Sequence, residues 1–227
     1  MVAKRKQSRA MREADIYGGD PRLLPVYSVG EVAHHLRLHP STVRSWVQAR
    51  GGLIVPADGK GALLSFQNLT EVHVMSLLRT YEISAQKIRR AAEYLRQRLD
   101  TEHPLAEVQI TTDHRELFTD VFGTLVAVTG KQPGQAAIEP VLARYLERIE
   151  REHGQLARLY PLIHGDARPV VIDPRRKSGA PYLVELGVET HALASRYRSG
   201  ETAKAIAADY DTSPELILQA LRYERAA

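Results

Sequence analysis

The chain has 227 residues, of which 44% are hydrophobic, so it can bury a core as one large domain or as two small ones. It has no cysteine, which excludes disulfides, thiolate metal sites and cysteine catalysis and fits a reducing cytoplasm. No apolar run approaches the ~20 residues that a membrane helix needs, so we expect a cytoplasmic location and no membrane partner. The net charge of +4 favours an acidic partner only mildly.

Residues 1–25 are expected to form a flexible basic arm. Its first twelve residues contain cations and no acid: Lys4, Arg5, Lys6, Arg9 and Arg12. One interpretation is a solvated tail. The other is an extension that contacts phosphates without reading the base sequence.

The segment from Tyr27 to Trp46 predicts two short helices joined by a tight turn. Ser28 stands where the first helix needs a cap, and Glu31, three residues later, completes a capping box. Pro40 suits the first turn of the second helix. An apolar-cored pair with a polar open side favours a helix-turn-helix that enters a DNA major groove. A plain helical hairpin with a polar outside is the alternative.

The residues expected to bind DNA are those on the open side of the second helix, together with cations placed to contact phosphates. They are Ser41, Thr42, Arg44, Ser45 and Gln48, with Arg37, Arg50 and Lys60 as the phosphate candidates. Arg44 is the best single candidate, because its guanidinium group can pair bidentately with guanine or clamp a phosphate.

Two short apolar runs between Arg50 and Phe66 flank a turn rich in glycine, so a β-hairpin is predicted there. A hairpin that follows a helix-turn-helix is a wing, and Lys60 stands at its tip. Lys60 either reaches a phosphate or a minor-groove edge, or it serves solubility.

Two further helices are predicted, one over residues 68–80 with Asn68 as its cap and one over residues 84–99 with Ser84 as its cap. The second has a clean apolar stripe and an otherwise basic surface. That surface is either solvated, or adds contacts to the DNA backbone, or packs in a dimer.

Residues 26–99 resemble the winged helix-turn-helix of the MerR family. The resemblance rests on the order and spacing of Tyr27–Ala33, Ser41–Trp46, Val55–Pro56 and Ile83–Arg89. It implies DNA binding by the second helix and the wing. The chain departs from the family at Ala62–Phe66, where the family has an arginine-rich tyrosine motif, and in lacking the metal-binding cysteines and long C-terminal coiled-coil helix of MerR sensors.

Residues 101–164 predict a small α+β unit. It has alternating strands within 105–128, an amphipathic helix over 138–149 with Glu147 and Arg151 paired on its exposed side, and a strand over 156–163. No catalytic motif is present, so no enzyme is predicted. Two loose polar groups lack ligand spacing, so we expect no metal site and no cofactor. They are Asp113, His114 and Glu116, and His153, His164 and Asp166.

Residues 165–227 predict a short hairpin, Pro169–Pro174 with Gly179–Val184, followed by three helices near 190–197, 202–210 and 213–223. The shape is similar to a second helix-turn-helix. Its last 27 residues carry a net negative charge, however, which is a poor match for a DNA groove. The expected role is contact with a protein partner or dimerisation.

This tail resembles a small domain typical of bacterial antitoxins, through Val171–Pro174, Gly200-Glu201 and Ala208–Tyr210. The whole order, from the lead-in Tyr17–Arg22 onward, is similar to a long subclass of VapB-type antitoxins. The resemblance implies neutralisation of a PIN-like ribonuclease toxin and binding of operator DNA to repress the operon. The expected domains are a basic arm (residues 1–25), a DNA-binding domain (26–100), a linker unit (101–164) and a toxin-binding or dimerisation domain (165–227).

The expected fold class is mainly α with small β elements, that is, α+β. One short recognition helix reads few base pairs, so a homodimer on a palindromic operator is expected, or a hetero-oligomer with the toxin. Arg222 and Arg225 are the candidates for toxin binding, because the resemblance gives such toxins an acidic Mg²⁺ pocket that a cation can fill. Alternatively, both arginines complement the dipole of the last helix.

A second function stays open: a MerR-like regulator that responds to a small ligand, with residues 105–164 as its sensor. A thermal-shift screen with metabolites distinguishes the two, because a specific ligand raises the melting temperature by mass action.

Overall fold

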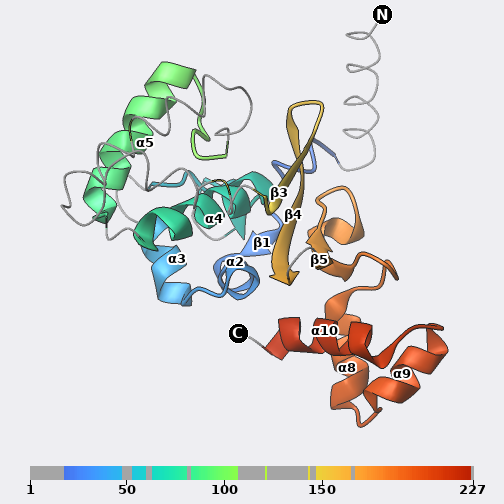
Figure 1. Ribbon diagram of the computed structural model, residues 1–227. Helices are drawn as coiled ribbons and strands as arrows, with labels where there is room; N and C mark the ends of the chain where they lie inside the picture. Colours follow the sequence, from blue (N-terminus) through green and yellow to red (C-terminus); the bar gives the residue numbers. More distant parts are fainter. Residues whose placement is uncertain are drawn as a thin grey trace, which may run out of the picture.

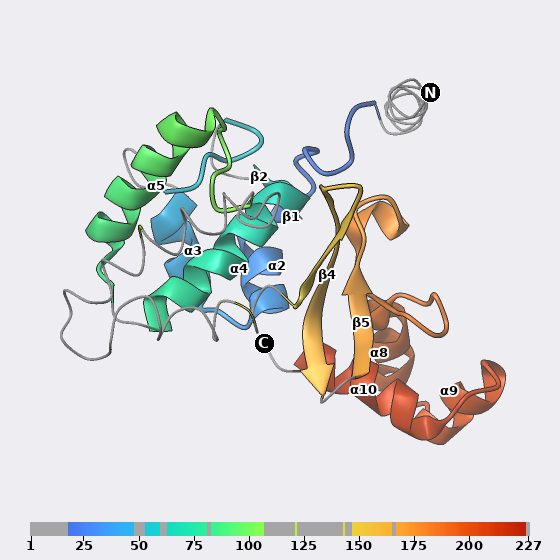
Figure 2. The same cartoon turned by 45° about the horizontal axis from the view of Figure 1, so that its top comes forward.

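The structure, a computed structural model, describes residues 18–47, 53–59, 63–80, 83–106, 121, 143, 147–164 and 167–225. An antiparallel sheet stands between two groups of helices, with α2 to α5 on one side (Figure 1) and α8 to α10 on the other (Figure 2). The predicted mixed α+β class is confirmed. The basic arm up to residue 17 and most of the predicted linker unit lie outside the described residues.

The predicted helix pair is present as α2 (Val29–Leu36) and α3 (Pro40–Val47). The capping box of α2 is confirmed, because the Glu31 amide donates to Ser28 Oγ at 3.2 Å and the Ser28 amide donates to Glu31 Oε2 at 2.7 Å. Two amide groups that no helical carbonyl could reach are therefore satisfied.

Ser28→Ala is expected to lower the free energy of unfolding by about 1 kcal/mol, because it leaves the Glu31 amide without its acceptor. A urea titration followed by circular dichroism measures the loss. Ser195→Ala, in an exposed position within α8 (Thr190–Arg198), is the matched control and should change stability little. An equal loss in both variants would contradict the cap.

The predicted hairpin of the wing is wrong in its pairing. Strand β2 (Leu63–Leu64) pairs antiparallel with β1 (Tyr27–Ser28), and residues 53–55 form no strand. Other partners take the backbone groups of residues 53–55: the Ile54 amide donates to the Trp46 carbonyl at 3.4 Å, and the Val55 carbonyl accepts from Asn68 Nδ2 at 2.8 Å.

Two longer helices follow, α4 (Phe66–Thr80) and α5 (Ala85–Leu99). The predicted cap of α5 is confirmed, since Ser84 Oγ accepts from the Lys87 amide. The predicted cap of α4 is wrong, because Asn68 lies inside the helix. Ser65 precedes the helix, and its hydroxyl accepts from the Asn68 amide while Asn68 Oδ1 accepts from the Ser65 amide.

The central sheet has the strand order β3 (Ile149–Glu152), β4 (Gln155–His164), β5 (Ala167–Ile172) and β6 (Tyr182–Leu183), all neighbours antiparallel. Strand β4 confirms the strand predicted over 156–163. The helix predicted over 138–149 lies mostly outside the described residues. At its end it is wrong, because both Ile149 and Arg151 belong to β3.

The tail agrees closely with its prediction. Strands β5 and β6 pair, and α8 is followed by α9 (Ala203–Asp209) and α10 (Pro214–Arg225). Thr202 caps α9 by accepting from the Ala205 amide, and Ser213 Oγ accepts from the Leu216 amide at the start of α10.

Two clusters of buried apolar side chains lie on the two sides of the sheet. The first joins β1 and α2 to α5 with sheet residues such as Leu159 and Ile172. The second joins Val170 and Leu183 to the three C-terminal helices. Strand β5 thus contributes residues to both clusters, Ile172 to the first and Val170 to the second. The predicted domain boundary near residue 165 falls between β4 and β5, which are paired, and it stays a prediction.

Candidate nucleic-acid interface

Helix α3 has a buried side and an exposed polar side. Val43, Trp46 and Val47 are buried in the first core cluster. Ser41, Arg44 and Ser45 are exposed, and Thr42 is half-buried. The buried side fixes the orientation of the helix, so its polar side is presented outward as a rigid surface.

Two hydroxyl groups on this surface already have local partners. Ser41 Oγ lies 2.6 Å from His39 Nδ1, and Ser45 Oγ donates to the Thr42 carbonyl at 2.7 Å. Each hydroxyl oxygen keeps a lone pair for a further donor, such as a base amino group. Within the described ranges no carboxylate pairs with Arg44, so its guanidinium group is available to an outside acceptor.

Arg37 lies in the turn that joins α2 to α3. Arg37 ends α2 in the left-handed region with φ 56°, and its amide donates to the His34 carbonyl at 3.2 Å. Its side chain is exposed. The remaining predicted DNA contacts, Gln48, Arg50 and Lys60, lie outside the described residues.

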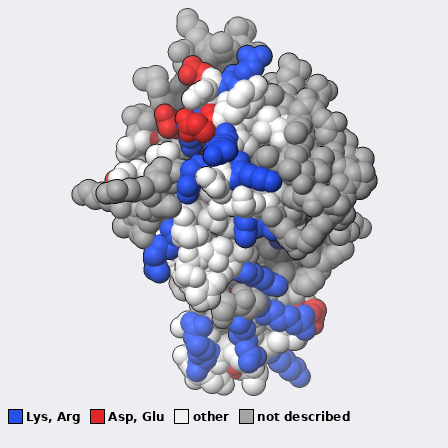
Figure 3. All heavy atoms as spheres, turned by 90° about the vertical axis from the view of Figure 1, so that its left-hand side faces the viewer, with Lys and Arg blue, Asp and Glu red and all other residues white. Residues whose placement is uncertain are grey.

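Lysine and arginine side chains extend along the face that carries α3 and α5 and continue to the C-terminal helices below (Figure 3). Few aspartates and glutamates interrupt them; most of these lie near the upper end of this view and another lies at its lower right edge. Such a distribution complements a polyanion, because each cation near a phosphate releases a condensed counterion.

The last helix of the chain packs directly against the first helix of the pair. The Tyr223 hydroxyl lies 2.8 Å from His35 Nδ1 and the two rings stack with centroids 6.3 Å apart, although 188 residues separate them. His34 Nε2 lies 3.9 Å from Glu224 Oε2. On the other side of the same contact, the Tyr27 hydroxyl donates to the Gly179 carbonyl at 3.0 Å.

This contact is buried and neutral at its centre. Burial lowers the pKa of His35 to about 4, with a further lowering by nearby His34 and an opposing effect of Glu31. Burial likewise raises the pKa of Tyr223, so its phenol stays protonated and can donate to the neutral imidazole. Gly179 is tightly enclosed, since a Cβ atom there would lie 2.2 Å from the Tyr27 hydroxyl.

The two predicted toxin-binding arginines are both exposed on α10, on either side of Tyr223 in the sequence. Arg222 Nη1 pairs with Glu215 Oε1 at 2.7 Å. Arg225 is the last residue of the helix and suits its carbonyl end electrostatically. Both interpretations of these arginines therefore stay open.

The described ranges contain no group of three or more His, Cys, Asp or Glu side chains arranged to hold a metal ion. Of the earlier metal candidates, His153 stands in the exposed turn between β3 and β4. No helix in the described part of the chain combines the length and apolarity needed to cross a bilayer.

Comparison with known proteins finds a family model that matches the tail and relatives that match most of the chain. Residues 170–223 match the family model described as "Protein of unknown function (DUF433)". Over 224 residues the chain is 26% identical to the "Putative antitoxin VapB45" of Mycobacterium tuberculosis (strain ATCC 25618 / H37Rv), covering 87% of this chain and 93% of that protein. The resemblance to VapB-type antitoxins is confirmed.

Two further proteins of the same organism are similar along most of their length. The "Uncharacterized protein Rv2308" is 28% identical over 216 residues, covering 88% of this chain and 90% of its own. The crystal structure of Rv2018 superposes with a TM-score of 0.68 at 24% identity, covering 87% of this chain and 98% of that one. At that identity the superposition establishes the fold alone.

Proposed function

We propose that this protein is the antitoxin of a toxin–antitoxin pair, which neutralises a PIN-like ribonuclease and binds the operator of its own operon. The observation that carries the proposal is the similarity, across 87% of the chain, to the relative named "Putative antitoxin VapB45". That similarity spans both the helix pair and the tail, so it concerns the whole arrangement of the protein.

For DNA binding we propose a MerR-like helix-turn-helix with α3 as the recognition helix. Its exposed Ser41, Arg44 and Ser45 supply hydroxyl and guanidinium groups of the kind that read base edges and phosphates. Its buried side, centred on Trp46, holds the helix against the core. Because α3 has only eight residues, a two-fold dimer on a palindromic site is the expected assembly.

Arg44→Ala is expected to weaken binding to the protein's own promoter DNA by about 1–3 kcal/mol, the value of a bidentate contact to a base. A mobility-shift titration at fixed salt measures the change. Arg176→Ala removes an exposed guanidinium from the connection between β5 and β6 and is the matched control.

If Arg44→Ala and the control bind as tightly as the unchanged protein, Arg44 is not part of the interface. If the unchanged protein prefers its promoter no more than unrelated DNA of equal length, operator recognition itself is refuted. The Arg44→Ala substitution removes an exposed side chain and leaves the core unchanged. The unfolding curve of the variant should therefore coincide with that of the unchanged protein.

For toxin neutralisation we propose that α10 presents Arg222 and Arg225 to the acidic pocket of the ribonuclease. Both side chains are exposed, and a guanidinium group can occupy a site that otherwise holds a divalent cation. The protein is then expected to act in the cytoplasm, where such a toxin and its operon meet.

A further inference from the structure

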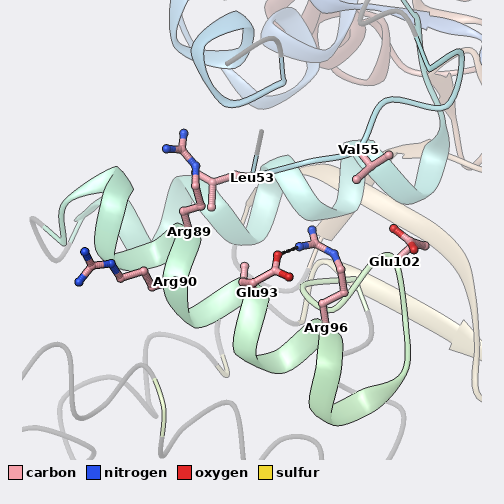
Figure 4. A pocket seen from close by; sticks show the side chains of 8 residues that line it. Leu53, Val55, Arg89, Arg90, Glu93, Arg96 and Glu102 are labelled. Carbon is pink, nitrogen blue, oxygen red and sulfur yellow. Dashed lines mark hydrogen bonds and ion pairs between the residues drawn. The ribbon is translucent and has the colours of Figure 1, made fainter. Parts of the chain in front are cut away.

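A cavity of about 610 Å³ lies between α5 and the segment Leu53–Val55 (Figure 4). Its apolar part is formed by Leu53, Val55 and Ala92. Its polar part comes mainly from α5, which contributes the three arginines Arg89, Arg90 and Arg96. The volume is within the range of small-molecule sites, which typically measure ~300–1,000 Å³.

The guanidinium groups of this cavity have more N–H donors than the described residues around them supply acceptors. Arg96 Nη1 donates to Glu93 Oε2 at 2.6 Å, which occupies one arginine. No carboxylate in the described part of the chain pairs with Arg89 or Arg90. Two enclosed donors, Nε of Arg89 and Nε of Arg96, have no acceptor among the described residues. Buried donors without acceptors are rare, and they indicate a missing partner.

We propose that this cavity binds an oxyanion of the phosphate-ester class. A phosphate group offers several acceptor oxygens, and the guanidinium fork of Arg89 or of Arg96 can donate to two of them, whereas Arg90 points away from both (Figure 4). The apolar wall of Leu53 and Val55 favours an ester whose organic part covers it over inorganic phosphate. Rotation of the Arg89 side chain then gives its enclosed Nε donor an acceptor.

Two carboxylates moderate the site. Glu93 competes with the ligand for Arg96, and Glu102 lines the same cavity. The balance of three arginines against two glutamates still favours an anion, but only with modest affinity. The carboxylate of Glu93 provides a test, because removing it should strengthen binding, whereas a purely structural role of the pair would not.

The test is calorimetric titration of the full-length protein with inorganic phosphate and with phenyl phosphate. Phenyl phosphate is expected to bind several-fold more tightly, because its ring covers the apolar wall. Arg89→Ala should weaken both by about tenfold, the usual effect of losing one hydrogen bond to a charged group. Glu93→Gln should strengthen both several-fold. Arg98→Ala, also on α5 but outside the cavity, should leave both unchanged.

A mobility shift with promoter DNA distinguishes the source of the phosphate. If it belongs to the DNA backbone, Arg89→Ala reduces the slope of log affinity against log salt by about one, and Arg176→Ala, in the connection between β5 and β6, does not. If it belongs to a free ester, DNA binding stays unchanged while the calorimetric signal is lost. Failure of both anions to bind, or equal weakening by the Arg89 and Arg98 substitutions, would overturn the site, whatever becomes of operator recognition.

Discussion

Trp46→Ala is expected to lower the free energy of unfolding by about 3–5 kcal/mol, the usual cost of removing a large aromatic from a core. Trp46 is 4% exposed and belongs to the cluster that joins the helix pair to α4 and α5. It also positions the chain that follows α3, because its carbonyl accepts from the Ile54 amide at 3.4 Å. Urea unfolding should be followed by circular dichroism, since the substitution removes the chain's single tryptophan.

Tyr94→Ala is the matched control for this experiment. Tyr94 is also an aromatic residue in a helix, but it is 52% exposed. Its replacement should change stability by no more than about 0.5 kcal/mol, as is usual at exposed positions. Similar losses in the two variants would mean that Trp46 does not anchor α3 as described.

The contact between α2 and α10 is expected to make stability depend on pH between 6.5 and about 4. In this window the unfolded chain binds a proton at His35 and the folded protein does not, so stability falls as the pH falls. The slope approaches about 1.4 kcal/mol per pH unit, which gives a total near 3 kcal/mol. Above pH 6.5 this contribution is fully present, and below the folded pKa no more of it is lost.

His35→Gln isolates this effect from other groups that titrate in the same range. Glutamine cannot take up a proton there, but its amide can still meet the Tyr223 hydroxyl. The difference in unfolding free energy between the original and the variant should therefore shrink as the pH is lowered. Parallel curves from pH 7 to pH 4 would contradict a buried, neutral His35.

Local elements were predictable because their signals lie within a few residues of one another. The caps Ser28 with Glu31 and Ser84 are each read from the spacing of a cap and its helix, and both are present. The three C-terminal helices and the β5–β6 pair were predicted on the same basis.

Strand partners were less predictable, because pairing depends on which segment reaches an edge first in space. Residues 53–55 and 63–64 look like two arms of a hairpin, but Tyr27–Ser28 takes the second arm as its partner. The cap of α4 was misplaced by three residues, because Ser65 and Asn68 satisfy each other and either can be taken for the cap from sequence alone.

The candidate DNA surface was predicted in part. The polar side of α3 followed from helical spacing, and Ser41, Arg44 and Ser45 are exposed as expected. The contact of Tyr223 with His35 could not be predicted, because no local pattern links residues 188 positions apart. The basic surface of α5 was visible in the sequence, but the cavity that it lines together with Leu53 and Val55 was not.

The most direct test of the proposed antitoxin function is co-purification with the product of the neighbouring gene, which the proposal predicts to be a PIN-like ribonuclease. When both are expressed together, the tagged full-length protein is expected to retain the ribonuclease on the column and to restore growth. Arg222→Glu combined with Arg225→Glu should lose both, because it places negative charge against an acidic pocket. If the unchanged protein leaves the ribonuclease unbound and growth arrested, the proposed function is wrong.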